Sequence, residues 1–195
     1  MREAVRRWRD TPLAVRSSDA AEDLPSASYA GLYTTVLDVN GEDELMAAVR
    51  RCWASAFGDV VRSYHPQLAS ERPRLAVLIQ PMVRARAAGV AFTADPVTGD
   101  PDAVMVEAVL GTGERLVSGT ATPDEWVVRG DSAVRRGGGE EAIDAAVVRA
   151  VAALAQQVEQ HQGRPQDVEW ALAGETVVLL QARPMTAMPD PVTWT

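Results

Sequence analysis

Two segments near the C-terminal end of the chain carry polar side chains at a spacing that suits a metal ion and a phosphate group. Asp167 and Glu169 alternate with apolar residues in the first segment, Gln181 and Arg183 do so in the second, and a turn-like stretch, 173–176, separates them. Side chains alternate along a strand and cross-strand neighbours lie about 5 Å apart, so pairing would gather all four on one face. Carboxylate and amide oxygens suit Mg²⁺, and a guanidinium grips phosphate oxygens in pairs. The pattern indicates a metal–nucleotide site, although an exposed hairpin face with ordinary charges explains it too.

A second candidate lies near the N-terminus, where a short apolar strand gives way to a polar loop. Arg16 is followed there by Ser17 and Ser18, so a guanidinium, two hydroxyls and backbone amides are available to an anion. On its own this is weak, because a loop arginine is usually a solvated charge. Gly111 and Gly113 are spaced so that the backbone can approach a phosphate, but a simple turn is the better explanation of a lone pair of glycines.

Composition excludes several classes of protein. The net charge of −8 argues against nonspecific binding to nucleic acid or to an anionic membrane, since both need a basic surface. We find no apolar run long enough to span a bilayer and no signal peptide, so a cytoplasmic protein is expected. The single cysteine, Cys52, excludes an internal disulfide framework and is expected to pack in a core. All 19 basic residues are arginine, so no lysine is available to bind phosphate.

The elements that would position these residues are mostly strands, with two long helices. Apolar or β-branched runs predict strands at 13–16, 33–39, 75–79, 89–93, 104–109 and 126–128, besides the two segments of the hairpin. The short apolar run 75–79 is expected to be a buried strand. An apolar stripe at helical spacing predicts one helix, whose buried face is formed by Leu45, Val49, Trp53 and Phe57. A second apolar stripe predicts another helix, whose buried face is formed by Ile143, Val147, Val151, Leu154 and Val158. It follows Gly137–Gly139, which are expected to interrupt regular secondary structure. Few βαβ crossovers are possible, which predicts an α+β fold with a mixed or antiparallel sheet.

Five segments together resemble the nucleotide-binding domain of phosphoenolpyruvate synthase, which also occurs in pyruvate phosphate dikinase and rifampicin phosphotransferase. The segments that carry the resemblance are 14–31 (AVRSSDAAEDLPSASYAG), 88–100 (AGVAFTADPVTGD), 111–119 (GTGERLVSG), 167–170 (DVEW) and 180–184 (LQARP). Their order and spacing are kept from about Leu13 to Thr186. We therefore expect a partial ATP-binding domain at 13–186, an N-terminal helix or tail at 1–12, and a tail at 187–195.

The resemblance implies an ATP-grasp fold that clamps ATP between two subdomains. Enzymes of this family pass the β-phosphate of ATP to a histidine on a separate swivelling domain, and that histidine phosphorylates an acceptor held by a third domain. By motif match, Arg16 is similar to the arginine that holds the ATP phosphates, and Thr35 to a threonine in the same pocket. Gln80, Met82 and Val83 match the hinge whose backbone usually meets adenine.

The same match assigns roles to the hairpin. Glu169 and Gln181 are similar to the family's Mg²⁺-facing pair, Asp167 to an accompanying acid of the nucleotide site, and Arg183 to a second phosphate clamp. On this basis Arg16 and Arg183 are the expected catalytic residues, because phosphoryl transfer is catalysed mainly by positioning and charge neutralisation.

The chain also departs from the family pattern. The family domain normally begins with a further subdomain that carries a glycine-rich segment and a phosphate-binding lysine, and this sequence starts just before the arginine motif. His65 and His161 lack the setting of the family's phosphohistidine. We expect one component of a split ATP-dependent phosphotransferase, inactive alone, with a protein partner supplying the missing subdomain, the phosphohistidine domain or both. The alternatives are a nucleotide-binding or regulatory module without turnover, and a vestigial assembly subunit.

Overall fold

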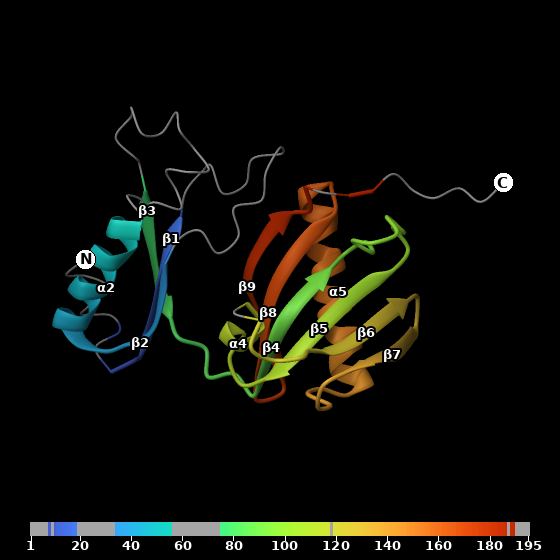
Figure 1. Ribbon diagram of the computed structural model, residues 1–195, viewed down its shortest axis with the longest axis horizontal. Helices are drawn as coiled ribbons and strands as arrows, with labels where there is room; N and C mark the ends of the chain where they lie inside the picture. Colours follow the sequence, from blue (N-terminus) through green and yellow to red (C-terminus); the bar gives the residue numbers. More distant parts are fainter. Residues whose placement is uncertain are drawn as a thin grey trace. The chain divides into compact units, whose positions relative to one another are not determined.

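The structure is a computed structural model that describes residues 8, 10–18, 34–55, 75–117, 119–186 and 188–189. The chain divides into two compact units, Met1–Met82 and Val83–Thr195. Each has its own sheet and its own buried core (Figure 1). All strand pairs among the described residues are antiparallel, and two long helices accompany them. The predicted α+β class is therefore confirmed. No helix in the described part of the chain has the length and apolar character needed to cross a membrane.

The first unit is a three-stranded sheet with one helix packed on it. Its strands are β1 (Leu13–Ser18), β2 (Thr35–Val39) and β3 (Ala76–Pro81), in the order β2–β1–β3. The helix α2 (Gly41–Ser55) begins with three acidic residues in its first turn, where the positive end of the helix dipole favours negative charge.

The core of this unit lies between α2 and one face of the sheet. It is formed by Leu13, Val15, Val39, Leu45, Ala48, Val49 and Cys52. The Cys52 thiol is fully buried, where it donates to the carbonyl oxygens of Val15 and Thr34 at 3.6 and 3.3 Å. Burial raises the pKa of this thiol, with Arg51 opposing the shift. The prediction of a core cysteine is confirmed.

Two predictions for this unit were wrong. Trp53 was expected in the buried stripe of the helix, yet its side chain is 47% exposed. The buried face instead turns through the small residues Ala48 and Cys52, which let the helix sit close to the sheet. β3 was expected to be buried, but Leu78 is 42% exposed, because within the described residues α2 packs on only one face of the sheet. Phe57 lies outside the described residues.

The second unit is a six-stranded sheet in the order β7–β6–β5–β4–β8–β9. Its strands are β4 (Ala87–Phe92), β5 (Val104–Leu110), β6 (Asp124–Arg129), β7 (Ser132–Gly138), β8 (Gln166–Ala173) and β9 (Thr176–Pro184). The long helix α5 (Ala145–Gln162) packs on one face, and the short helix α4 (Glu114–Val117) follows β5 (Figure 1).

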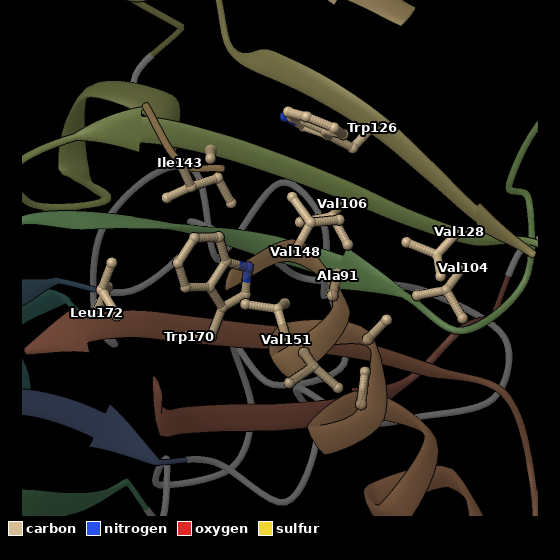
Figure 2. Close-up of a cluster of buried hydrophobic side chains, with 14 of the residues drawn as sticks. Ala91, Val104, Val106, Trp126, Val128, Ile143, Val148, Val151, Trp170 and Leu172 are labelled. Atoms are coloured by element: carbon tan, nitrogen blue, oxygen red, sulfur yellow. The ribbon is translucent and has the colours of Figure 1, made fainter. Parts of the chain in front are cut away.

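The core of the second unit lies under α5. Valines and tryptophans from β5, β6 and β8 meet the helix there, with Trp170 and Val106 fully buried (Figure 2). The helix begins at the cap Asp144, whose side chain accepts from the backbone amides of Ala146 and Val147, and it ends at the left-handed Gly163. Its buried residues are Val148, Val151, Ala152 and Ala155.

The boundaries around α5 differ from the prediction. Ile143 is buried but precedes the helix, and Leu154 lies on the flank of the buried face rather than in it. β7 was not predicted at all. Its sequence is largely polar because it is an edge strand, and Gly137 and Gly138, two of the glycines expected to interrupt regular structure, form its end.

Candidate functional site

The β8–β9 hairpin brings four of the predicted site residues together. Asp167 pairs with Arg183, and Glu169 pairs with Gln181, across neighbouring antiparallel strands. Val168 alternates with them and lies in the core under α5, so the four polar side chains project from the opposite face of the sheet. The hairpin geometry predicted from the sequence is confirmed, whereas the chemical roles of the four residues stay predictions.

A β-bulge in this hairpin fixes which side chains share that face. Trp170 pairs with Leu179, but the next residue, Glu169, pairs with Gln181, so Leu180 is an extra residue in β9. Strict alternation from the turn would place Leu180 opposite Glu169 and would direct Gln181 to the helix side. A bulge inserts one residue and resets the alternation beyond it. Gln181 and Arg183 face away from α5 because of this irregularity.

Asp167 and Arg183 form a partly buried ion pair. The Arg183 Nε and Nη2 groups both donate to Asp167 Oδ2, at 2.8 and 2.6 Å. The Arg183 side chain is 23% exposed and the Asp167 side chain 11%. The other carboxylate oxygen, Oδ1, is buried and has no hydrogen-bond partner among the described residues. The predicted phosphate clamp therefore shares its guanidinium with a neighbouring carboxylate.

Glu107 of β5 lies on the same face and was not predicted as a site residue. Val90 of β4 pairs with Glu107 on one side and with Glu169 on the other, while Glu107 also pairs with Glu125 of β6. Burial raises the pKa of the Glu107 carboxyl, and the charges of Glu125 and Asp167 raise it further. A row of polar side chains thus crosses the sheet from β6 to β9.

One feature of the sequence indicates that Glu107 is unusual. It is the single charged residue of an otherwise apolar strand, Val104–Leu110, and a charge in such a strand needs a reason. Its neighbours Glu125 and Asp167 come from distant parts of the sequence, so the acidic grouping follows only from the strand order.

The donor set fits a magnesium ion only in part. Within the described residues, no group of three or more Asp, Glu, His or Cys side chains is arranged to hold a metal ion. The paired Glu169 and Gln181 offer oxygen ligands from two neighbouring positions. Mg²⁺ is usually held by one or two carboxylates, with waters and substrate phosphates completing the octahedron. The pair suits a magnesium ion that arrives with a phosphate chain better than one bound by protein alone.

The first unit places Arg16 beside Thr35. The two residues pair across β1 and β2, and Arg16 pairs with Leu78 on its other side. Ala14 pairs with Gln80, two positions along, so Gln80 shares the face of Arg16. Val15 alternates with them and faces the core under α2. These side chains therefore lie on the face of the sheet that α2 does not cover.

The predicted hinge continues from β3. The backbone amide of Met82 donates to the carbonyl of Pro12 at 2.7 Å, so this N–H serves the sheet. Met82 ends the first unit and Val83 begins the second.

The segment 88–100 acts as a structural support for the hairpin. An added Cβ at Gly89 would lie 1.8 Å from the carbonyl oxygen of Glu107, so β4 and β5 approach closely only because residue 89 is glycine. Just after β4, the backbone amide of Thr93 donates to the backbone carbonyl of Gln166 at 3.0 Å. The backbone amide of Gln166 donates in turn to Thr93 Oγ1 at 2.8 Å. These bonds fix the start of β8 immediately before Asp167.

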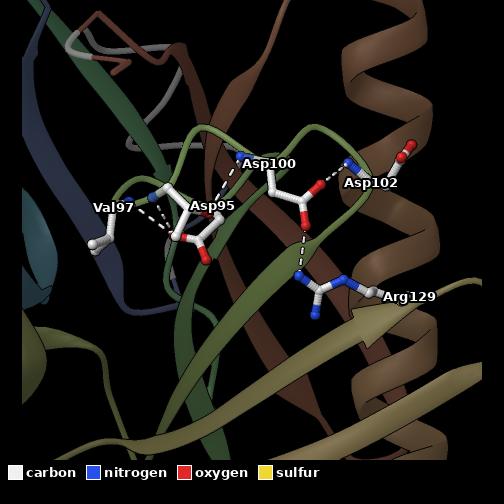
Figure 3. A network of polar contacts seen from close by, with 6 residues as sticks. Asp95, Val97, Asp100, Asp102 and Arg129 are labelled. Atoms are coloured by element: carbon white, nitrogen blue, oxygen red, sulfur yellow. Dashed lines mark hydrogen bonds and ion pairs between the residues drawn. The ribbon is translucent and has the colours of Figure 1, made fainter. Parts of the chain in front are cut away.

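The loop after β4 is held by its own aspartates (Figure 3). Asp95 Oδ1 accepts from the amides of Val97 and Thr98, at 2.8 and 3.1 Å, and the Asp100 carboxylate pairs with Arg129. Burial alone raises the pKa of Asp95, but the hydrogen bonds from the two amides and from Thr98 outweigh it and lower the pKa overall. The Asp95 carboxylate therefore uses these amides within the turn, and Asp100 ties the loop to β6 through Arg129.

The glycine-rich segment at Gly111 also forms a turn. Gly111 has a left-handed backbone with φ of 80°, and its amide donates to the Arg86 carbonyl at 2.9 Å. Leu116 donates back to Gly113 as α4 begins. The turn interpretation of these glycines therefore accounts for their spacing without a phosphate.

Comparison with known proteins gives consistent matches along most of the chain. A family model described as the AMP/ATP-binding domain of pyruvate phosphate dikinase matches residues 1–147 and 134–192. A rifampicin phosphotransferase from Streptomyces is 39% identical over 90% of this chain and 23% of its own length. A probable phosphoenolpyruvate synthase from Archaeoglobus fulgidus is 36% identical over 90% of this chain and 27% of its own. The phosphoenolpyruvate synthase of Pyrococcus furiosus is 34% identical over 93% and 27%. The chain spans about a quarter of the length of these curated relatives.

Proposed function

Since this chain belongs to the family of the pyruvate phosphate dikinase AMP/ATP-binding domain, we propose that it is the Mg-ATP-binding component of a dikinase-type phosphotransferase. The observation that carries the proposal is the register of the β8–β9 hairpin. It sets Glu169 beside Gln181 and Asp167 beside Arg183 on one face, which gives oxygen ligands and a guanidinium within one strand pair.

In this proposal the hairpin handles the metal and the phosphates. Glu169 and Gln181 would hold Mg²⁺, and Arg183 would bind phosphate oxygens. The metal, when bound, supplies charge neutralisation at the phosphate chain. Asp167 is the acid that accompanies these residues, and its contact is with Arg183. The residues of this chain thus bind and orient the nucleotide rather than take part in covalent steps.

The first unit contributes its own set of residues to the nucleotide. Arg16 would bind the phosphates and Thr35, its neighbour across the strands, would line the same place. The Gln80 side chain shares their face, and the backbone of Met82 and Val83 would meet the base. The polar groups of this set are a guanidinium, a hydroxyl and an amide, which suit the phosphate and sugar parts of a nucleotide.

The phosphoryl acceptor would come from outside the described site. The relatives are about four times longer than the matched region, so a histidine or other acceptor is proposed to reside in other domains or on a partner chain. The arginine-only composition favours one alternative, a nucleotide-binding module without turnover, because no lysine is present to stabilise the transferred phosphoryl group.

Calorimetric titration with Mg-ATP tests the proposed function. The wild-type protein should bind Mg-ATP, and Glu169→Ala should lower the affinity by about tenfold or more, because a charged ligand group is lost. Glu175→Ala, in the exposed turn of the same hairpin, is the matched control and should bind like the wild type. Failure of the wild-type protein to bind Mg-ATP would refute the proposal, and an unchanged Glu169→Ala affinity would refute the metal assignment.

A further inference from the structure

Three aspartate–arginine ion pairs are found among the described residues of the second unit, and they differ in how the carboxylate oxygens are hydrogen-bonded. Asp100–Arg129 is exposed, at the loop that follows β4. Asp124 is fully buried, yet both of its oxygens are used, Oδ1 by Arg135 Nε and Oδ2 by the backbone amide of Ala142. Asp167 is also buried, but Oδ1 has no partner in the described part of the chain and Oδ2 is served by Arg183.

The difference decides how far the guanidinium of Arg183 can move. If Arg183 swung away toward a ligand, the Asp167 carboxylate would stay buried without a charged partner, and breaking such a pair is strongly unfavourable. Asp124 would still keep its backbone donor if Arg135 left. Arg183 must therefore meet any ligand while it remains on Asp167.

While it is bound to Asp167, the Arg183 guanidinium keeps N–H groups that do not bond to that carboxylate. A guanidinium carries five N–H groups, and Arg183 uses Nε and Nη2 on a single oxygen, Asp167 Oδ2. Nη1 has no hydrogen-bond partner among the described residues, and the side chain is 23% exposed. The anchored arginine thus has one side of its fork occupied and the other side available on the face that carries Glu169 and Gln181.

We propose that Asp167 is a positioning residue that anchors Arg183, so that the Nη1 side of the guanidinium is presented to the phosphate chain of the nucleotide. Asp167 does not itself touch the nucleotide. This proposal rests on the proposed function for its ligand, but the anchoring is a property of the protein without ligand. Preorganisation of this kind lowers the entropy lost when a flexible arginine binds an anion.

Nuclear magnetic resonance tests the anchoring without any nucleotide. The Nε–H resonance of Arg183, identified by its disappearance in Arg183→Lys, should be visible at neutral pH and exchange slowly with water, because the group is hydrogen-bonded and partly buried. In Asp167→Asn it should exchange rapidly, whereas in the control Asp100→Asn it should be unchanged. A resonance that is unprotected in the wild type, or equally protected in Asp167→Asn, would overturn the anchoring.

A double-mutant cycle with Mg-ATP tests the positioning. Asp167→Asn should weaken Mg-ATP binding by about tenfold, the scale of one charge-assisted contact, and should have no further effect in the Arg183→Ala background. Asp100→Asn, which also removes an aspartate–arginine pair, should bind like the wild type. An additional loss in the Arg183→Ala background would show that Asp167 contacts the ligand itself and would overturn the proposal, as would full affinity in Asp167→Asn. If the wild type binds no Mg-ATP, the proposed function fails and the resonance experiment judges the anchoring alone.

Discussion

At the scale of single residues, the face of the second sheet away from α5 concentrates negative charge. Glu107 has a raised pKa from burial first and from Glu125 and Asp167 next, and Asp167 has a buried oxygen without a donor among the described residues. Arg183 is the one cation paired with a carboxylate of this group in the described contacts. A face with this excess of carboxylates attracts cations from solution.

Replacement of Arg183 tests how much its ion pair with Asp167 contributes to the stability of the fold. Arg183→Ala leaves the buried Asp167 carboxylate without its partner and should lower the free energy of unfolding by about 2–3 kcal/mol, at the lower end for a buried pair because both side chains are partly exposed. Denaturant unfolding followed by circular dichroism measures the change. Asp167→Asn added to Arg183→Ala should recover much of the loss, and a double variant as unstable as Arg183→Ala would contradict this account.

The raised pKa of Glu107 makes the free energy of unfolding change with pH in a predictable direction. Its folded-state pKa is raised above the unfolded value, so the folded protein holds the proton more tightly and ionisation opposes folding. The penalty is absent below the unfolded pKa, grows as the pH rises, and is complete above the folded pKa. Glu107→Gln should therefore raise the free energy of unfolding at neutral pH and reduce its fall between mildly acidic and neutral pH. Denaturant midpoints across that range measure this, and a destabilised Glu107→Gln at pH 7 would contradict it.

At the scale of elements, the position of the hairpin depends on how closely β4 approaches β5. Gly89 permits this approach, since a Cβ would lie 1.8 Å from the Glu107 carbonyl oxygen. β4 in turn pairs with β8 through six residues, from Ala87–Leu172 to Phe92–Asp167. The strand that carries Asp167 and Glu169 is thus aligned by a strand that carries no site residue itself.

Gly89→Ala should separate β4 from β5 and lower the free energy of unfolding by about 3 kcal/mol, the upper range for overpacking. Gly113→Ala is the matched control, because its Cβ would make an ordinary contact of 3.7 Å with Ala88. Thermal unfolding of the two variants side by side measures the difference. Equal stability of the two would mean that the strands adjust at no cost.

Local sequence signals predicted the hairpin, because the turn 173–176 and the strands on either side of it are contained in a short segment. The shared polar face also depends on the extra residue Leu180, which alternation from the turn does not indicate. They failed where the deciding contacts are distant. Glu107 joins the site only through the strand order β5–β4–β8, and β7 is a strand only because β6 offers it an edge. Trp53 was misplaced because the periodicity gave weight to large side chains, whereas the buried face of α2 runs through Ala48 and Cys52.

At the scale of the whole molecule, the chain has two cores that share no residue and two separate sets of candidate nucleotide-binding residues. The family model covers nearly the whole chain, yet the chain covers about a quarter of each longer relative. The matched family is that of an AMP/ATP-binding domain, and turnover is proposed to need residues outside the described site.

A reconstitution experiment tests whether this chain supplies nucleotide binding while turnover needs residues from elsewhere. The chain alone should bind Mg-ATP without forming AMP, because no acceptor histidine has been assigned within it. Addition of a partner that carries an acceptor histidine, such as a product of a neighbouring gene, should start AMP formation, which ion-exchange chromatography of the nucleotides measures. AMP formation by the chain alone would contradict the prediction, and no AMP with any such partner would favour a binding module.

The extra residue Leu180 has a consequence for how such a site can arise and change. A perfectly regular hairpin with the same turn and the same sequence would direct Gln181 and Arg183 into the core, where their polar groups would be buried without partners. The site exists because the sheet is locally imperfect. Substitutions can adjust its chemistry one side chain at a time, but a single inserted residue between the turn and Gln181 would turn both polar groups inward at once. The length of this short segment is therefore constrained as strictly as the identity of any residue in it.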